Sequence, residues 1–183
     1  MRYKCITGGP ISENCYLLID EKTNQAAVVD PGFLNDVLLN EIKKYTVQRI
    51  LLTHGHFDHI WEADRLHEML GVPVCAYETE AAFAADDKQN GSLLMMYESI
   101  TCKVHEAFKD GETFLIGEVP VTVLHTPGHT AGGVSYITPD AVFTGDTLMG
   151  YSVGRCDLPT GNSAELRESL KRLAALPGNP DIC

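Results

Sequence analysis

Four side chains of the kinds that bind metal ions lie within six positions of this chain, directly after the apolar segment 50–52. They are His54, His56, Asp58 and His59. Side chains of an extended chain alternate between its two sides, so His54 and His56 are expected to point the same way. A turn after them can direct Asp58 and His59 elsewhere. Imidazole and carboxylate ligands suit zinc, and also iron or manganese, so the segment predicts one or two neighbouring metal positions at the end of a strand.

Composition and charge limit the class of protein. The chain has 183 residues, 44% of them hydrophobic and 21% charged, as expected of one globular domain. No apolar run approaches the ~20 residues of a membrane span, and the first residues lack the apolar region of a secretory signal. We therefore expect a cytoplasmic protein. A net charge of −11 disfavours nucleic acid as a partner and leaves a small molecule as the expected substrate. The oligomeric state has no signal in the sequence.

The spacing of apolar residues predicts strands and helices in both halves of the chain. Strands are expected at 3–6, 15–19, 26–29, 49–53, 72–76, 103–107, 113–116, 119–125, 133–138 and 141–143, and helices at 36–45, 60–70, 78–85 and 164–173. Asn35 is a predicted helix cap, and Asn162 with Glu165 a predicted capping box. The order of these elements favours a layered α/β arrangement, with two packed sheets and helices outside. The six cysteines form no Cys-x-x-Cys pair and are expected to be free thiols.

Two further segments place a metal-ligand residue just after a glycine at the end of an apolar strand. His129 follows Gly128, and Asp146 follows Gly145. Binding sites of layered α/β proteins collect at strand ends. We therefore expect both loops to converge on residues 54–59.

These motifs, in this order, resemble the metallo-β-lactamase superfamily, and most of all its small glyoxalase II-type hydrolases. The motifs are Glu13-Asn14-Cys15-Tyr16, Val29-Asp30-Pro31-Gly32, residues 54–59, Thr126-Pro127-Gly128-His129-Thr130, Thr144-Gly145-Asp146-Thr147 and Val153-Gly154-Arg155-Cys156-Asp157-Leu158-Pro159. The resemblance implies a single domain over 1–183. Its fold would be a four-layer αβ/βα sandwich, in which two mixed sheets pack face to face with helices outside. Arg155 and Asp157 are expected to form an ion pair within the last motif.

The resemblance also implies a ligand set. The first metal would be held by His54, His56 and His129, and the second by Asp58 and His59, with Asp146 bridging the two. Asp30 would accept a hydrogen bond from a ligand imidazole and so orient it. One or two zinc ions are expected, with iron or manganese as alternatives, and no other cofactor site is predicted. Relatives carry a later Gly-His-Gly strand that completes the second metal site, which residues 176–183 do not match. A weak second site and low activity are therefore a further expectation.

The activity implied is hydrolysis of a thioester or ester of a small molecule by a metal-bound hydroxide. Asp58 would hold the nucleophile and receive its proton, and is the expected catalytic residue. Two alternatives stay open at the level of the sequence. One is an oxidoreductase with a single iron, similar to the persulfide dioxygenases of the same superfamily. The other is a lactonase with the same site chemistry.

Overall fold

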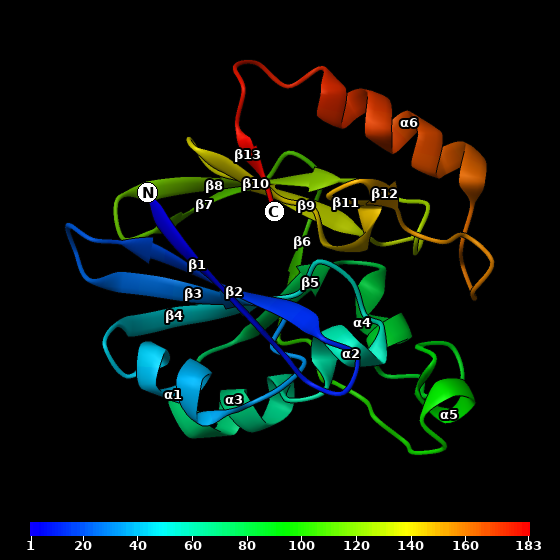
Figure 1. Ribbon diagram of the computed structural model, residues 1–183, viewed down its shortest axis with the longest axis horizontal. Helices are drawn as coiled ribbons and strands as arrows, with labels where there is room; N and C mark the ends of the chain where they lie inside the picture. Colours follow the sequence, from blue (N-terminus) through cyan, green and yellow to red (C-terminus); the bar gives the residue numbers. More distant parts are fainter.

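Two β-sheets face each other at the centre of the computed structural model, which describes residues 1–183 (Figure 1). The first sheet has six strands in sequence order. They are β1 (Arg2–Gly8), β2 (Glu13–Asp20), β3 (Gln25–Val29), β4 (Thr46–Leu51), β5 (Val74–Tyr77) and β6 (Glu106–Phe108). Strands β1 to β3 pair antiparallel, and β3 to β6 pair parallel, so the sheet is mixed.

The second sheet has five strands in the order β13-β10-β9-β8-β7. They are β7 (Thr113–Ile116), β8 (Val119–His125), β9 (Val134–Ile137), β10 (Ala141–Phe143) and β13 (Asp181–Ile182). Only the β10–β13 pair is parallel. A separate hairpin of β11 (Leu148–Met149) and β12 (Ser152–Val153) follows β10.

Helices cover the outer faces of both sheets (Figure 1). The helical elements of the chain are α1 (Asp36–Ile42), α2 (Phe57–Ile60), α3 (Ala63–Leu70), α4 (Glu80–Ala84), α5 (Ser92–Met95), α6 (Ser163–Ala174) and the 3₁₀ turn η1 (Gly145–Thr147). Helices α1 and α3 lie against the six-stranded sheet, and α6 lies on the far side of the five-stranded sheet. This arrangement confirms the predicted pair of mixed sheets with helices outside. None of the helices is long and apolar enough to cross a bilayer.

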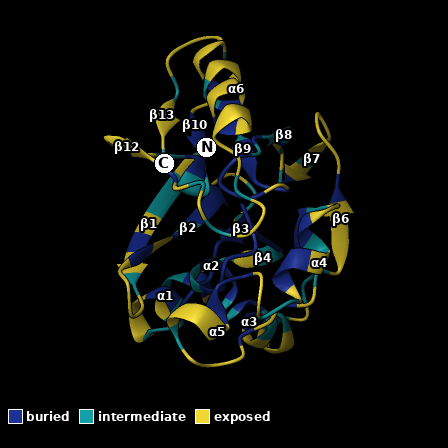
Figure 2. Ribbon diagram, turned by 90° about the vertical axis from the view of Figure 1, so that its right-hand side faces the viewer, coloured by how far each residue is buried: buried dark blue, intermediate teal, exposed yellow.

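The strands at the centre are buried on both faces, which gives the protein two apolar cores. In β3, Ala26 and Val28 belong to the core under α1 and α3, whereas Ala27 and Val29 belong to the core between the sheets. This alternation follows from the period of two along a strand. Figure 2 shows the result, with the largely buried strands β2 and β3 between more exposed outer elements.

The predicted helix over 60–70 is wrong at its start. Helix α2 ends at Ile60 and α3 begins at Ala63. Between them, the backbone N–H of Glu62 donates to the carbonyl oxygen of Pro31, at 3.0 Å, instead of continuing a helix. The end of α3 agrees with expectation, because Gly71 adopts the left-handed conformation there, with φ 68°. The helix predicted over 36–45 is also too long, since α1 ends at Ile42.

Both predicted caps form, but the capping box does not. The Asn35 side chain accepts the Leu38 N–H at 2.9 Å. The Asn162 side chain accepts from the N–H groups of Ala164 and Glu165. The reciprocal bond from Glu165 is replaced, because the Asn162 N–H donates to the carbonyl oxygen of Gly128 at 2.8 Å. The start of α6 is thereby tied to the loop that carries His129. All six cysteines are unpaired, as predicted.

Candidate metal centre

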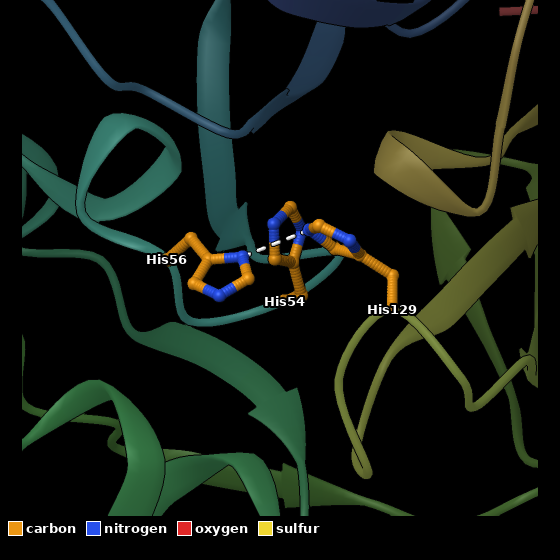
Figure 3. A group of neighbouring side chains, drawn as sticks. All are labelled: His54, His56 and His129. Carbon is orange, nitrogen blue, oxygen red and sulfur yellow. Dashed lines mark hydrogen bonds between the residues drawn. The ribbon is translucent and has the colours of Figure 1, made fainter. Parts of the chain in front are cut away.

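Three buried imidazoles from two loops converge on one point (Figure 3). His54 and His56 lie in the loop after β4, and His129 lies in the loop after β8. Nδ1 of His56 is 2.8 Å from Nε2 of His129. The ring centroid of His54 lies 4.9 Å from that of His56 and 4.8 Å from that of His129. One nitrogen from each ring lies within 4.8 Å of the others. The two loops therefore meet, as their positions in the sequence predicted.

A second group of possible ligands lies beside the first. It consists of His54, His59 and Asp146, again with one ligand atom each within 4.8 Å. Nε2 of His59 is 3.3 Å from Oδ1 of Asp146 and 3.4 Å from Oδ2 of Asp58. The other oxygen of Asp146 is 3.4 Å from Nε2 of His129. Asp146 thus lies between the two groups, where a bridging ligand would have to lie. The assignment of each residue to a particular ion stays a prediction.

The protonation states of His54, His56 and Asp146 suit a cation. Burial lowers the pKa of His54 well below its usual value of 6.5 and that of His56 to about 3, so both rings present free lone pairs at neutral pH. Burial opposes the charge on Asp146, but the hydrogen bond and charge of His59 lower its pKa to about 2. Nε2 of His54 is buried without any hydrogen-bond partner, which is costly unless a ligand satisfies it. Neutral imidazoles beside a carboxylate fit zinc or iron.

Asp30 fixes the geometry at the end of β4. Its side chain accepts the N–H of Thr53 at 2.7 Å and the Thr53 hydroxyl at 2.6 Å. Its Oδ2 also lies 2.9 Å from Nδ1 of His59. The other nitrogen of that ring faces Asp58 and Asp146. Asp30 therefore contacts the His59 imidazole, and its role in orienting a metal ligand stays a prediction.

His129 is oriented by the segment after β12. Its Nδ1 lies 2.8 Å from the carbonyl oxygen of Arg155. The Arg155 guanidinium makes two hydrogen bonds to Asp157, at 2.6 and 2.7 Å, so the predicted ion pair is confirmed. Gly154 packs directly against the backbone of Asp146, and a Cβ atom there would also lie 2.9 Å from Nδ1 of His129. Only glycine fits this approach.

Glu80, which has no signal in the sequence, is a buried carboxylate that connects the two histidine loops. Its side chain is among the most buried polar groups, and its Oε1 accepts the N–H of Gly55 at 2.8 Å, between His54 and His56. The other oxygen packs so closely on Gly132 that a Cβ atom there would collide with it. Burial raises the Glu80 pKa, and backbone N–H groups of Gly55 and Gly132 act against that rise. Nothing in segment 77–101 distinguishes this glutamate from its exposed neighbours Glu78 and Glu98.

The remaining histidines lie outside both ligand groups. His125 stacks on Tyr77, with ring centroids 4.2 Å apart, and its Nε2 lies 2.9 Å from the carbonyl oxygen of Ala131. It therefore supports the loop of His129. His67 and His105 stack on each other at 3.9 Å, near the end of α3.

The fold and the histidine-rich centre define a class of protein. This chain belongs to the metallo-beta-lactamase superfamily, whose family model matches residues 8–180. It is 37% identical to the probable metallo-hydrolase YqgX of Bacillus subtilis, over 97% of this chain and 86% of that protein. Among solved structures, it is similar to the BLEG-1 B3 metallo-beta-lactamase, with a TM-score of 0.91, 32% identity and coverage of 99% and 90% of the two chains. It is also similar to TTHA1623 in a di-iron-bound form, with a TM-score of 0.82, 32% identity and coverage of 98% and 90%.

These similarities support a divalent metal but do not fix its identity. The superfamily and the histidine group agree with metal binding. The di-iron form of TTHA1623 means that zinc, the metal expected from the sequence, is one candidate and iron another. The coarse prediction of a metallo-hydrolase is in line with the YqgX similarity.

Proposed function

We propose that this protein is a metal-dependent hydrolase that cleaves a thioester or ester of a small molecule, in the manner of glyoxalase II. The observation that carries the proposal is the convergence of His54, His56 and His129 beside a second group that contains His59 and Asp146. Asp58 and His59 also line a cleft, so a substrate can reach this side of the centre.

Each side chain has a part in this proposal. The three converging imidazoles would hold a cation, and Asp146 would serve both groups. Such a cation supplies Lewis acidity, lowering the pKa of a bound water to about 7 and polarising a carbonyl. Burial opposes the charge on Asp58, but nearby His59 lowers its pKa, so the carboxylate is ionised at neutral pH. An ionised Asp58 beside the centre would hold the attacking water and accept its proton.

A thioester suits the groups that are present. No lysine or arginine lines the cleft, and its one histidine, His59, is committed to Asp30 on its far side. A thiolate leaves without protonation at neutral pH, since the thiol pKa is about 8.5, whereas an alkoxide needs a proton or a cation.

One observation favours a second candidate, an iron-dependent oxidoreductase. His54, His59 and Asp146 are two imidazoles and one carboxylate within 4.8 Å, the ligand types of the iron facial triad. The similarity to a protein solved in a di-iron-bound form supports iron as the metal. Oxygen consumption on an organic persulfide by iron-loaded protein would support this candidate over the hydrolase.

The first experiment is elemental analysis of protein purified without added metal, followed by assays of zinc-loaded and iron-loaded protein. The panel contains a thioester, an oxoester, a lactone and a β-lactam, because one similar structure is a B3 metallo-beta-lactamase. We expect metal to co-purify and the thioester to be cleaved fastest. Cleavage of the lactone alone would assign the protein as a lactonase and contradict the thioester proposal.

The second experiment substitutes the shared ligand. Asp146→Ala is expected to reduce both metal content and hydrolysis to background, because Asp146 contacts both ligand groups. The matched control is Asp36→Ala, at the exposed start of α1, which should change neither. Full activity of the Asp146 variant would refute the assignment.

A further inference from the structure

The loop between β8 and β9 carries His129 to the candidate metal centre. The two ends of this loop are joined, because the N–H of Thr126 donates to the carbonyl oxygen of Gly133 at 2.8 Å. The His129 ring projects from the loop towards His54 and His56 (Figure 3). The position of the ring therefore depends on how the short segment before it is fixed.

Four consecutive carbonyl oxygens before His129 each accept a hydrogen bond from outside the loop. In chain order, the pairs are the Arg172 side chain to His125 at 2.6 Å, the Thr147 hydroxyl to Thr126 at 3.2 Å, the Ser169 hydroxyl to Pro127 at 2.6 Å and the Asn162 N–H to Gly128 at 2.8 Å. Three of the four donors belong to α6 or to its N-cap. Helix α6 therefore anchors the segment that leads to His129.

The contacts with the loop lie on one face of α6. Positions 162, 166, 169 and 172 are separated by four, three and three residues, which is the spacing of a single helix face. At position 166 the contact is one of packing, because a Cβ atom on Gly128 would lie 2.2 Å from the backbone nitrogen of Leu166. The backbone of the helix is thus in direct contact with the backbone of the loop.

Ser169 makes the contact that can be removed most cleanly. A serine inside a helix can bond the carbonyl oxygen four residues earlier in its own helix. The Ser169 hydroxyl instead donates to Pro127, 42 positions away in the chain. The side chain is only 1% exposed, and burial of a hydroxyl is unfavourable unless it is hydrogen-bonded. Alanine would serve for packing alone, so the hydroxyl points to a function in holding the loop.

From these contacts, and resting on the metal centre of the proposed function, we infer that Ser169 is a positioning residue for His129. Its hydroxyl fixes Pro127, two residues before the ligand, and so sets where the imidazole lies relative to the other two. The second nitrogen of that imidazole faces the carbonyl oxygen of Arg155. The centre is thus held from α6, on the outer side of the second sheet, as well as from the loops at the strand ends.

The test measures zinc affinity by competition with a chromophoric chelator, and the visible spectrum of protein loaded with one equivalent of cobalt. Ser169→Ala should bind zinc about three- to tenfold more weakly, the range that loss of one hydrogen bond allows, and should shift the cobalt absorption band. Ser163→Ala removes an exposed hydroxyl from the first turn of the same helix and should match the wild type. Wild-type affinity and an unchanged cobalt band in Ser169→Ala would overturn the inference.

A stability control separates positioning from general weakening of the fold. Thr138→Val removes a buried hydroxyl that donates to the carbonyl oxygen of Ala141 at 2.8 Å, at the end of β9 away from the His129 loop. Its urea midpoint should fall while its zinc affinity stays that of the wild type. A loss of zinc affinity as large as that of Ser169→Ala would mean that lowered stability explains both, and would contradict the inference.

A double-mutant cycle shows whether the effect passes through His129. In a His129→Ala background the ligand is absent, so Ser169→Ala should cause no further loss of zinc affinity. An equal loss in both backgrounds would mean that the hydroxyl acts elsewhere, and would refute the assignment.

Failure of the proposed function can be told apart from failure of this inference. If the zinc affinities differ as expected but no thioester or ester is cleaved, the proposed hydrolase is wrong and the inference stands. If the wild type binds neither zinc nor cobalt, the metal centre is wrong, and the His129 ring resonances of the metal-free variants are compared by NMR. Movement of these resonances in Ser169→Ala, but not in Ser163→Ala, supports the positioning contact by itself. Identical resonances in both variants contradict it.

Discussion

Glu80 gives the sharpest test of how the centre is built, because it lies outside every motif and yet holds both histidine loops. Glu80→Ala would leave the Gly55 N–H, which the carboxylate now accepts at 2.8 Å, buried without a partner. Such a loss costs about 1–3 kcal/mol. If that cost falls on the loop geometry, metal affinity drops roughly tenfold to 100-fold, since each 1.4 kcal/mol is a factor of ten. Outer hydrogen-bond partners of metal ligands have effects of about this size.

The assay is competition for zinc between the folded protein and a chromophoric chelator, with the cobalt-loaded protein examined by visible absorption. Glu80→Gln keeps an acceptor oxygen and should lose only part of the affinity. Glu78→Ala, two residues earlier and exposed, is the matched control and should bind zinc like the wild type. If Glu80→Ala lowers the urea midpoint but leaves zinc affinity and the cobalt spectrum unchanged, Glu80 has a structural role only, and the reasoning about loop position is wrong.

Two further outcomes are expected. Gly154→Ala should weaken zinc binding at least tenfold, because the new Cβ forces Asp146 and the segment around it to shift. The control Ser152→Ala, in the neighbouring hairpin, should bind zinc like the wild type. Equal zinc affinities of the two variants would contradict the close packing. The pH dependence of stability should include a contribution from Asp20, whose pKa is lowered from 3.8 to about 2, chiefly by the Glu118 N–H and the Thr23 hydroxyl. That stability is present above pH 3.8 and is lost as the pH falls towards 2. The free energy of urea unfolding of metal-free Asp20→Asn should therefore change less between pH 5 and pH 3 than that of the wild type. Identical pH profiles of the two proteins would argue against this contribution.

The candidate ligand residues could be located from the sequence because their signals are local. The run from His54 to His59 concentrates ligand types at a strand end, and His129 and Asp146 repeat the same glycine-then-ligand pattern. Convergence of the three loops followed from the rule that layered α/β proteins gather their sites at strand ends. The structure brings these side chains within a few ångströms of one another.

The supporting residues could not be predicted in the same way. Glu80 acts through one hydrogen bond to a residue 25 positions away, and no local pattern distinguishes it from exposed glutamates. The break between α2 and α3 depends on a bond from Glu62 to Pro31, and the incomplete capping box depends on a bond from Asn162 to Gly128. Each of these features is decided by a tertiary hydrogen bond that competes with a local preference.

The candidate centre draws its ligands from both sheets. The first sheet supplies the loop that carries His54 to His59, and the second supplies the loops that carry His129 and Asp146. An ion bound there would cross-link the two sheets, and its binding free energy would add to the stability of the folded protein. Removal of the metal would therefore abolish activity and also weaken the packing of the two sheets against each other.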